Sequence, residues 1–205
     1  CQSKTRTLKI AVLQFPGRNC DRDTLYVLRH VMKLDADLIW HNDFTHDAYD
    51  AVILPGGFSF GDHLRGGIIA AYSPSMKIVR EMAEKGKPVL GICNGFQTLI
   101  EAGLLPGALL RNSTLKFVCR WTDLRVRNRT SAFSCSFAND AVVRMPIAHN
   151  EGRFYADDEL LDQLESENRV VLEYADENPT GTSRGIVAVS NEKGNVVGMM
   201  PHPER

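Results

Sequence analysis

The sequence predicts an α/β fold with a mainly parallel central sheet, helices on both faces and an antiparallel elaboration in the second half. In the first half, short β-rich runs alternate with amphipathic helical patterns, and the connections between them are short. Such alternation is typical of parallel strands that are covered by helices on both faces. The second half carries extended segments separated by turn residues, which favours antiparallel pairing. A length of 205 residues fits one domain spanning 1–205.

Apolar runs and helical spacing locate the individual elements. In the first half, strands are expected at 8–13, 38–40, 51–54 and 88–92, and helices at 21–34, 76–83 and 96–102. In the second half, we expect extended segments within 115–147, an acidic helix at 157–166 and strands at 170–172, 186–189 and 196–200. A turn at 192–195 joins the last two strands into a predicted hairpin.

The charge balance and hydropathy exclude several classes of partner. The chain has 24 Lys and Arg against 25 Asp and Glu, so its formal net charge is -1. Without a basic excess, we expect no binding to nucleic acid or to an anionic membrane surface. No apolar run approaches the roughly 18 residues of a membrane span, and the first residues lack the apolar core of a signal peptide. We therefore expect a soluble, cytoplasmic protein.

The cysteine content points to the same compartment. Five cysteines is an odd number, and no two of them form a CxxC pair. This pattern disfavours a disulfide framework and a zinc site, so no metal site is predicted and a reducing compartment is expected. The chain begins at Cys1 and stops at Arg205, and we expect both ends to be truncated.

The strongest local signal for chemistry is the pentapeptide at 91–95, Gly-Ile-Cys-Asn-Gly, between a predicted strand and a predicted helix. It matches the G-x-nucleophile-x-G elbow, with Cys93 in the place of the serine of α/β hydrolases. A sharp turn of this kind needs small residues two positions before and after the nucleophile. It also places the sulfur at a helix N-terminus, where the helix dipole favours the thiolate. The alternative is a small buried cysteine in an ordinary turn.

A thiolate nucleophile needs a base and a group that orients the base. Among six histidines, His202 follows the strand at 196–200 and is held between two prolines. Glu204 lies two positions later, and in an extended segment residues i and i+2 project to the same side. We therefore expect the carboxylate to approach the imidazole and to select its tautomer. Taken alone, a His-Pro-Glu sequence at a chain end is usually a solvated tail.

A third signal follows the strand at 51–54, where the chain reads Pro-Gly-Gly-Phe-Ser-Phe-Gly-Asp. Paired glycines at the carboxyl end of a parallel strand allow backbone N–H groups to approach a ligand closely. Acyl transfer needs two such donors for the developing oxyanion, and the amides of Gly57 and Asn94 are the natural pair. A phosphate cradle is the competing interpretation, but neither glycine-rich nucleotide motif occurs in the chain.

Together these segments resemble the class I (triad) glutamine amidotransferases. The resemblance rests on the elbow continued to Gln97, on the His-Pro-Glu sequence at 202–204 and on the Pro-Gly-Gly sequence at 55–57. Three further segments, 15–21, 56–62 and 147–152, are similar to the glutaminase subunits of phosphoribosylformylglycinamidine synthase, the PurQ type. The resemblance covers nearly the whole chain. It implies a flavodoxin-like fold, glutamine hydrolysis and a role in purine biosynthesis.

The resemblance also implies a role for each residue of the site. Cys93 is the expected nucleophile, His202 the base and acid, and Glu204 the orienting carboxylate. The expected oxyanion donors are Gly57 and Asn94, and Gly56 and Gln97 are expected to hold the glutamine. No cofactor is expected in this chain. The resemblance further implies that ATP and Mg are used by a partner synthetase, and that a small third protein bridges the two.

Two alternatives to this function stay open at the level of sequence. The first is a stand-alone cysteine hydrolase or peptidase on the same scaffold, and the second is a non-catalytic regulatory subunit that binds glutamine. Within the triad, His149 is the competing histidine, because Asn150 and Glu151 beside it imitate a triad. The resemblance places His149 at the pocket or the partner face rather than in the role of base.

Overall fold

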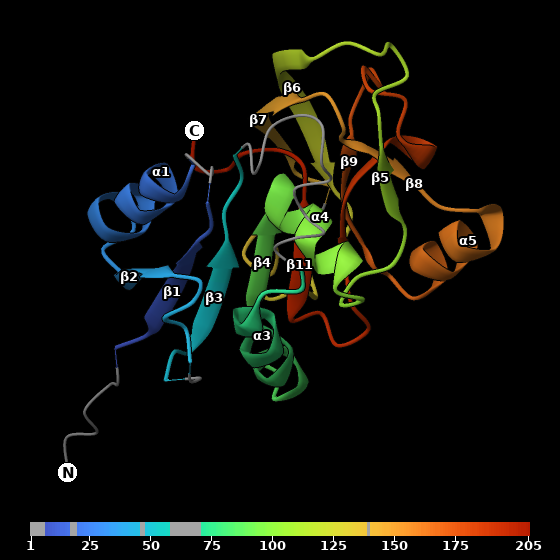
Figure 1. The fold of residues 1–205 in the computed structure, drawn as a ribbon. Coiled ribbons are helices and arrows are strands. Elements are labelled where there is room, and N and C mark those ends of the chain that lie inside the picture. The colour runs from blue at the N-terminus through green and yellow to red at the C-terminus, as the bar shows by residue number, and fades with distance from the viewer. Residues whose placement is uncertain (1–6, 17–19, 46–47, 58–70, 139) are drawn as a thin grey trace.

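The computed structural model describes residues 7–16, 20–45, 48–57, 71–138 and 140–205. A nine-stranded sheet of order β2-β1-β3-β4-β11-β10-β9-β6-β7 forms its centre (Figure 1). In that order, the strands are β2 (Asp35–Trp40), β1 (Lys9–Gln14), β3 (Ala51–Leu54), β4 (Val89–Ile92), β11 (Val196–Met199), β10 (Ile186–Ser190), β9 (Val170–Tyr174), β6 (Val118–Val126) and β7 (Val142–His149). A separate two-stranded sheet pairs β5 (Ala108–Leu110) with β8 (Arg153–Tyr155).

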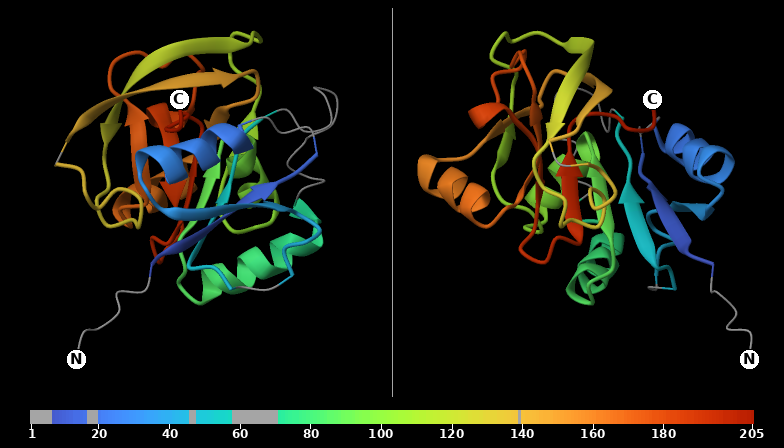
Figure 2. Two further views of the ribbon diagram at one scale, coloured as in Figure 1. Left: turned by 90° about the vertical axis from the view of Figure 1, so that its left-hand side faces the viewer. Right: turned by 180° about the vertical axis from the view of Figure 1, so that it is seen from behind.

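The helical elements lie on both sides of the sheet. They are α1 (Asp21–Tyr26), the π-helix η1 (Val27–Val31), α3 (Pro74–Glu84), α4 (Asn94–Glu101), α5 (Asp158–Ser166) and the 3-10 turn η2 (Ser183–Gly185). Helix α1 packs on β1 and β2, and α4 packs on β3, β4 and β11. Figures 1 and 2 show α1 on one face of the parallel strands and α3 and α4 on the other.

The predicted fold class is confirmed. Strands β2, β1, β3, β4 and β11 pair with one another in parallel, and β10, β9, β6 and β7 continue the same sheet beyond β11 in antiparallel pairs. Every residue of β3, β4 and β11 is buried, as expected for strands covered on both faces. The predicted hairpin of β10 and β11 is present, with Val189 opposite Gly198.

The structure differs from the prediction in the first helix and in two short strands. The helix expected at 21–34 stops at Val31, and β2 begins at Asp35 rather than at 38. The chain leaves the helix at Lys33, where φ is 56°, and the amide of Leu34 donates to the carbonyl of Leu28 at 2.9 Å. This left-handed residue ends the helix and frees the next residues to pair with β1. Strands β5 and β8 were not predicted, since three residues are too few for a visible alternation.

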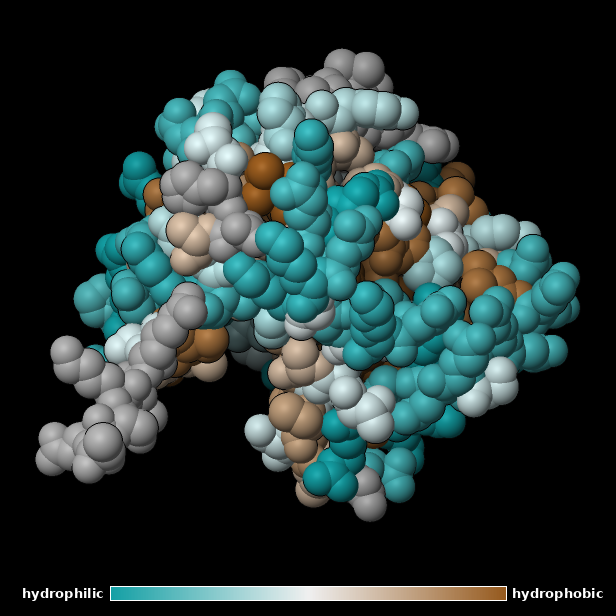
Figure 3. All heavy atoms as spheres, turned by 90° about the horizontal axis from the view of Figure 1, so that it is seen from below, coloured by the Kyte–Doolittle hydropathy of each residue, from teal (hydrophilic) through white to brown (hydrophobic). Residues whose placement is uncertain are grey.

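On the α1 face, an apolar groove of about 420 Å³ opens between η1 and the segment that follows β6. Its floor includes Ile53, Leu90 and Ile92 of the parallel strands, and Phe133 lines the opposite wall. Figure 3 shows a hollow at the lower edge of the face that is seen from below, with hydrophobic residues beside it. Glu204 lines the groove as well, so the last residues of the chain lie between this groove and the carboxyl ends of the strands.

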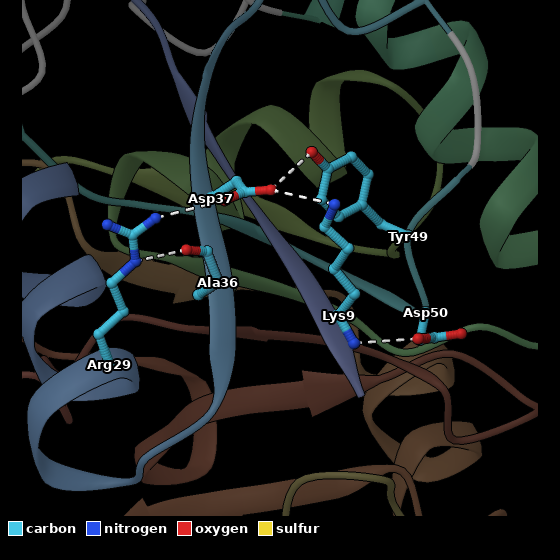
Figure 4. A network of polar contacts seen from close by, with 6 residues as sticks. All are labelled: Lys9, Arg29, Ala36, Asp37, Tyr49 and Asp50. Atoms are coloured by element: carbon cyan, nitrogen blue, oxygen red, sulfur yellow. Dashed lines mark hydrogen bonds and ion pairs between the residues drawn. The ribbon is translucent and has the colours of Figure 1, made fainter. Parts of the chain in front are cut away.

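The edge of the parallel half is held by polar contacts around Asp37 of β2 (Figure 4). Its carboxylate accepts a hydrogen bond from the Tyr49 hydroxyl at 3.0 Å and contacts Lys9 Nζ at 3.4 Å and Arg29 Nη2 at 3.3 Å. Lys9 and Arg29 keep nearly half of their side chains exposed, so each ion pair stabilises the fold by at most about 1 kcal/mol. The contacts fix the position of the edge strand rather than supplying the stability of the core.

Within the described residues, no helix is both long enough and apolar enough to cross a membrane.

Candidate active site

Cys93 occupies a strained turn between β4 and α4. Its backbone φ is 52° and its ψ is -108°, a conformation that residues with a Cβ rarely adopt. The amide of Cys93 donates to the carbonyl of Met199 at 2.7 Å, which ties the turn to β11. An inert buried cysteine does not need such a backbone, whereas a nucleophile elbow does. The geometry therefore favours the nucleophile interpretation of Cys93 over the structural one.

The two glycines of the elbow are required by close packing. A Cβ on Gly91 would lie 2.6 Å from the carbonyl oxygen of Gly95, and a Cβ on Gly95 would lie 2.0 Å from the carbonyl oxygen of Leu54. Both distances are far below van der Waals contact, and the obstructing atoms belong to the backbone. The prediction that small residues must flank the nucleophile at both positions is thus confirmed.

Strand β11 delivers His202 to the elbow. It runs parallel to β4 with Met199 opposite Ile92, so the residues after both strands emerge at the same edge of the sheet. The amide of His202 donates to the carbonyl of Pro146 at 2.9 Å, which fixes the backbone beyond the strand. A Cβ on Gly56 would lie 3.0 Å from Cε1 of His202 and 3.1 Å from Cβ of Cys93. The loop after β3, the sulfur-bearing residue and the imidazole therefore meet at one point.

Glu204 contacts His202 as the spacing predicts. Nδ1 of the imidazole lies 2.7 Å from Oε1 of the carboxylate, and each side chain is only 3% exposed. Because a carboxylate only accepts hydrogen bonds, Nδ1 carries the proton and Nε2 is left as the basic nitrogen. Among the described residues, Nε2 has no hydrogen-bond partner although it is buried. This nitrogen is available to exchange a proton with a nucleophile or a substrate.

The electrostatic surroundings favour the protonated imidazole. Burial by itself lowers the pKa of His202, since it penalises the charged ring. The nearby thiols of Cys20 and Cys93 act in the opposite direction, as do the carboxylate of Glu204 and the charge on Cys93. The net effect raises the pKa of His202. An imidazolium beside a thiolate is the form that a cysteine nucleophile needs at neutral pH.

The remaining predicted residues lie just after β3 and at the start of α4. Gly56 and Gly57 follow β3, and Gly57 has a φ of 116°. Asn94 is the first residue of α4, where the helix leaves its amide without an intrahelical acceptor. Gln97 is buried one turn later, and its backbone N–H donates to the carbonyl of Cys93 at 3.2 Å. The roles of these residues as oxyanion donors and glutamine ligands stay predictions.

The glycine-rich sequence continues beyond the described residues. Positions 58–62 of this loop lie outside the residues that the structure describes, as do positions 17–19 of the segment at 15–21.

Sequence reasoning missed Cys20 as a neighbour of the site. This cysteine is buried just before α1, and its sulfur accepts a hydrogen bond from Nη2 of Arg205 at 3.3 Å. It follows β1 at the carboxyl end of a parallel strand, the same edge at which β4 presents Cys93. That position was the available signal, because ligands of open α/β sheets bind at this edge.

His149 is buried close enough to His202 for their charges to interact, but its ring serves a different arrangement. Its Nδ1 lies 3.1 Å from Oδ1 of Asn112, whose amide nitrogen donates to the carbonyls of Lys116 and His149. This orientation of Asn112 places the proton on Nδ1 of His149. Burial, followed by the charge on His202, lowers the pKa of His149 to about 4. His149 is therefore neutral at physiological pH.

A comparison with family models matches residues 7–205 to the CobB/CobQ-like glutamine amidotransferase domain. Among solved structures, the chain is similar to one in PurLQS from Thermotoga maritima, with 43% identity and a TM-score of 0.86. That match covers 97% of this chain and 89% of the other.

Two distant structures share the fold alone. A glutamine amidotransferase from Thermotoga maritima is 17% identical with a TM-score of 0.60, over 97% of this chain and 77% of its own. The CTPS glutaminase domain of Trypanosoma brucei, with bound acivicin, is 14% identical with a TM-score of 0.61. That match covers 97% of this chain and 86% of the other. With the family match over nearly its whole length and the elbow geometry described above, the chain belongs to the CobB/CobQ-like glutamine amidotransferase family.

Proposed function

We propose that this chain hydrolyses glutamine to glutamate and ammonia through a thioester on Cys93. The ammonia passes to the synthetase subunit of a phosphoribosylformylglycinamidine synthase in de novo purine biosynthesis. The observation that carries the proposal is the meeting of Cys93, His202 and the Gly56 loop at the carboxyl edge of the sheet. Family membership supports glutamine as the nitrogen donor. The 43% identity to a chain of PurLQS supports the assembly.

The first half-reaction forms the thioester. The thiol of Cys93 gives its proton to Nε2 of His202, and the thiolate attacks the side-chain amide carbon of glutamine. The electron pair of the C=O bond moves to oxygen, where the amides of Gly57 and Asn94 stabilise the oxyanion. The C–N bond then breaks as His202 returns the proton to the leaving nitrogen. The products of this step are ammonia and a γ-glutamyl thioester.

The second half-reaction regenerates the enzyme. Nε2 of His202 takes a proton from water, and the resulting hydroxide attacks the thioester carbon. The C–S bond breaks as His202 returns the proton to the sulfur of Cys93, and glutamate leaves. Throughout the cycle, Glu204 holds the ring in one orientation and stabilises the imidazolium. Every proton and electron pair is supplied by these residues and by water, so we infer that the chain uses no cofactor and that ATP and Mg serve the partner synthetase.

The resemblance adds two further inferences about the surroundings of the enzyme. We infer that a small third protein bridges this chain and the synthetase. We also infer a cytoplasmic location, which is supported by the cysteines: none of those in the described part of the chain forms a disulfide.

The test compares two nitrogen sources in the assembled complex. Cys93→Ala should lower the rate of glutamine-dependent synthesis by several orders of magnitude. The rate of synthesis from an ammonium salt should stay intact, because only the glutaminase step needs the thiolate. Cys119→Ala, which removes an exposed thiol on β6, is the matched control and should behave as the unmodified chain. Equal loss of both activities in Cys93→Ala would show that Cys93 is structural.

The same experiment separates the two alternative functions. A stand-alone hydrolase would turn over glutamine or a peptide without any response to the synthetase. A regulatory subunit would bind glutamine but form no covalent adduct with a glutamine-analogue electrophile.

A further inference from the structure

Cys20, His202 and Glu204 form a cluster of three different metal-ligand types. One ligand atom from each residue lies within 4.8 Å of the other two. The three come from distant parts of the chain, since Cys20 precedes α1 and the other two follow β11. Thiolate, imidazole and carboxylate are the protein ligands of Zn²⁺, and thiolate excludes hard cations such as Mg²⁺.

A second observation points to an unused capacity for ligands at the same place. Oε2 of Glu204 is buried and has no hydrogen-bond partner among the described residues. Most buried polar atoms in folded proteins are partnered, so an unpaired lone pair in the interior calls for an explanation. This oxygen is an electron-pair donor that a cation accepts.

We propose that Cys20, His202 and Glu204 bind a thiophilic divalent cation, with Zn²⁺ as the type, and that the bound ion inhibits glutamine hydrolysis. A thiolate and a carboxylate neutralise the two charges of the ion, and the imidazole of His202, which releases a proton to solvent on binding, completes three ligands. The fourth tetrahedral position is left to water. The inhibition, though not the binding, rests on the function proposed above.

The geometry requires a modest rearrangement. At Zn–ligand bonds of roughly 2.0–2.3 Å, tetrahedral ligand atoms lie about 3.3–3.8 Å apart, so the cluster has to contract by roughly 1 Å. Arg205, which donates to the sulfur of Cys20, is the cation that Zn²⁺ displaces. Coordination removes either the imidazole nitrogen or the carboxylate from the 2.7 Å contact between His202 and Glu204. An imidazole that is bound to Zn²⁺ can no longer take the proton of Cys93 and pass it to the leaving group, which explains the inhibition.

The first measurement is the inhibition of glutaminase turnover by added Zn²⁺ after chelator treatment of the full chain. The turnover rate of each variant with Zn²⁺ is divided by the zinc-free rate of the same variant. Cys20→Ala should need at least about tenfold more Zn²⁺ for half inhibition than the unmodified chain, because even outer-shell changes at metal sites cost roughly 10–100-fold in affinity. Cys119→Ala should match the unmodified chain. Equal sensitivity of Cys20→Ala and the unmodified chain would place the ion on Cys93 and His202 and overturn the proposal.

The second measurement detects binding without any activity. Co²⁺ gives a charge-transfer absorption band when a thiolate binds it, so Co²⁺ is used in place of Zn²⁺. It is added to Cys93→Ala, because this variant lacks the thiol of Cys93 and any band then comes from another cysteine. The band should appear in this variant and vanish in the double variant with Cys20→Ala. Absence of the band in Cys93→Ala would overturn the site. Because this result does not depend on catalysis, it stands even if Cys93→Ala shows that the proposed function is wrong.

Both measurements need folded variants, which far-UV circular dichroism checks. Cys20→Ser replaces Cys20→Ala if the smaller side chain disturbs the buried position, since a serine hydroxyl keeps the volume and binds Zn²⁺ poorly.

Discussion

Nδ1 of His202 and Oε1 of Glu204 lie 2.7 Å apart, with both side chains almost completely buried. The two residues are separated by one proline, so the contact is set by local backbone geometry rather than by long-range packing. A buried carboxylate in this position does not exchange protons itself. It holds the ring so that Nε2 faces the reacting atoms, and it stabilises the imidazolium when that forms.

Glu204→Gln should lower the glutaminase turnover number by about 10²–10⁴-fold and change KM for glutamine little. The amide keeps the shape of the carboxylate but loses the charge that stabilises the imidazolium, and the substrate does not touch this residue in the proposed mechanism. Steady-state kinetics of the assembled complex give both constants. The matched control is Glu151→Gln, a half-exposed carboxylate beside His149, which should leave turnover nearly unchanged. A rise in KM without a fall in turnover would show that Glu204 binds substrate instead.

Gly95→Ala should lower the free energy of unfolding by at least about 3 kcal/mol, at or beyond the upper end of ordinary overpacking. The added methyl would lie 2.0 Å from the carbonyl oxygen of Leu54, so α4 has to move away from β3. Urea denaturation measures the change. Gly86→Ala is the control, because its φ is 80° but no atom lies within 4 Å of the added Cβ. Gly86→Ala should cost only the backbone strain of about 1–2 kcal/mol. Equal costs for the two variants would contradict the packing argument.

His149 should make the fold less stable as the pH falls from about 6.5 to about 4. In the folded state the pKa of His149 is lowered to about 4, whereas the unfolded chain protonates at the ordinary value near 6.5. Between these values the unfolded state binds more protons, so stability is lost on acidification. From pH 7 to pH 5 the expected loss is about 2 kcal/mol.

His149→Gln isolates this effect from other titrating groups. Urea denaturation at both pH values should show that the unmodified chain loses about 2 kcal/mol more than the variant does. His202 acts with the opposite sign, because its pKa is raised and its contribution is lost only as the pH rises. An identical pH dependence of the unmodified chain and His149→Gln would show that His149 titrates normally in the folded protein.

The isolated chain should hydrolyse glutamine weakly and be activated by the synthetase subunit. An uncoupled glutaminase would waste glutamine, and the paired glycines at 56–57 allow the donor at Gly57 to turn away from the oxyanion. One misplaced donor costs roughly 10²–10³ in rate, which is the activation expected when the partner is added. The rate of glutamate formation with and without the synthetase measures it. Full activity of the isolated chain would favour the stand-alone hydrolase.

The main features of the site could be predicted from the sequence because they are local. The elbow at Cys93 depends on two glycines within five residues, and the contact of Glu204 with His202 depends on an i, i+2 spacing. The prediction that His202 lies beside Cys93 also depended on the resemblance to a known family. Strands β4 and β11 lie far apart in the sequence, and periodicity does not give the strand order.

The parts that sequence reasoning missed depend on long-range topology. Cys20 approaches His202 only because β1 and β11 end at the same edge of the sheet, and nothing within its own segment specifies that contact. His149 lies near His202 because β7 returns to the site at the far end of the antiparallel strands. The tautomer of its buried ring is set by Asn112, which lies 37 residues away in the sequence.

The central claim is that His202, and not His149, is the base that activates Cys93. Single-turnover acylation of Cys93 by glutamine, followed by mass spectrometry of the trapped adduct, tests it most directly. His202→Ala should reduce the acylation rate by several orders of magnitude, because it removes the proton shuttle itself. His149→Ala should reduce it far less. If His149→Ala abolishes acylation while His202→Ala retains it, the catalytic base has been assigned to the wrong histidine.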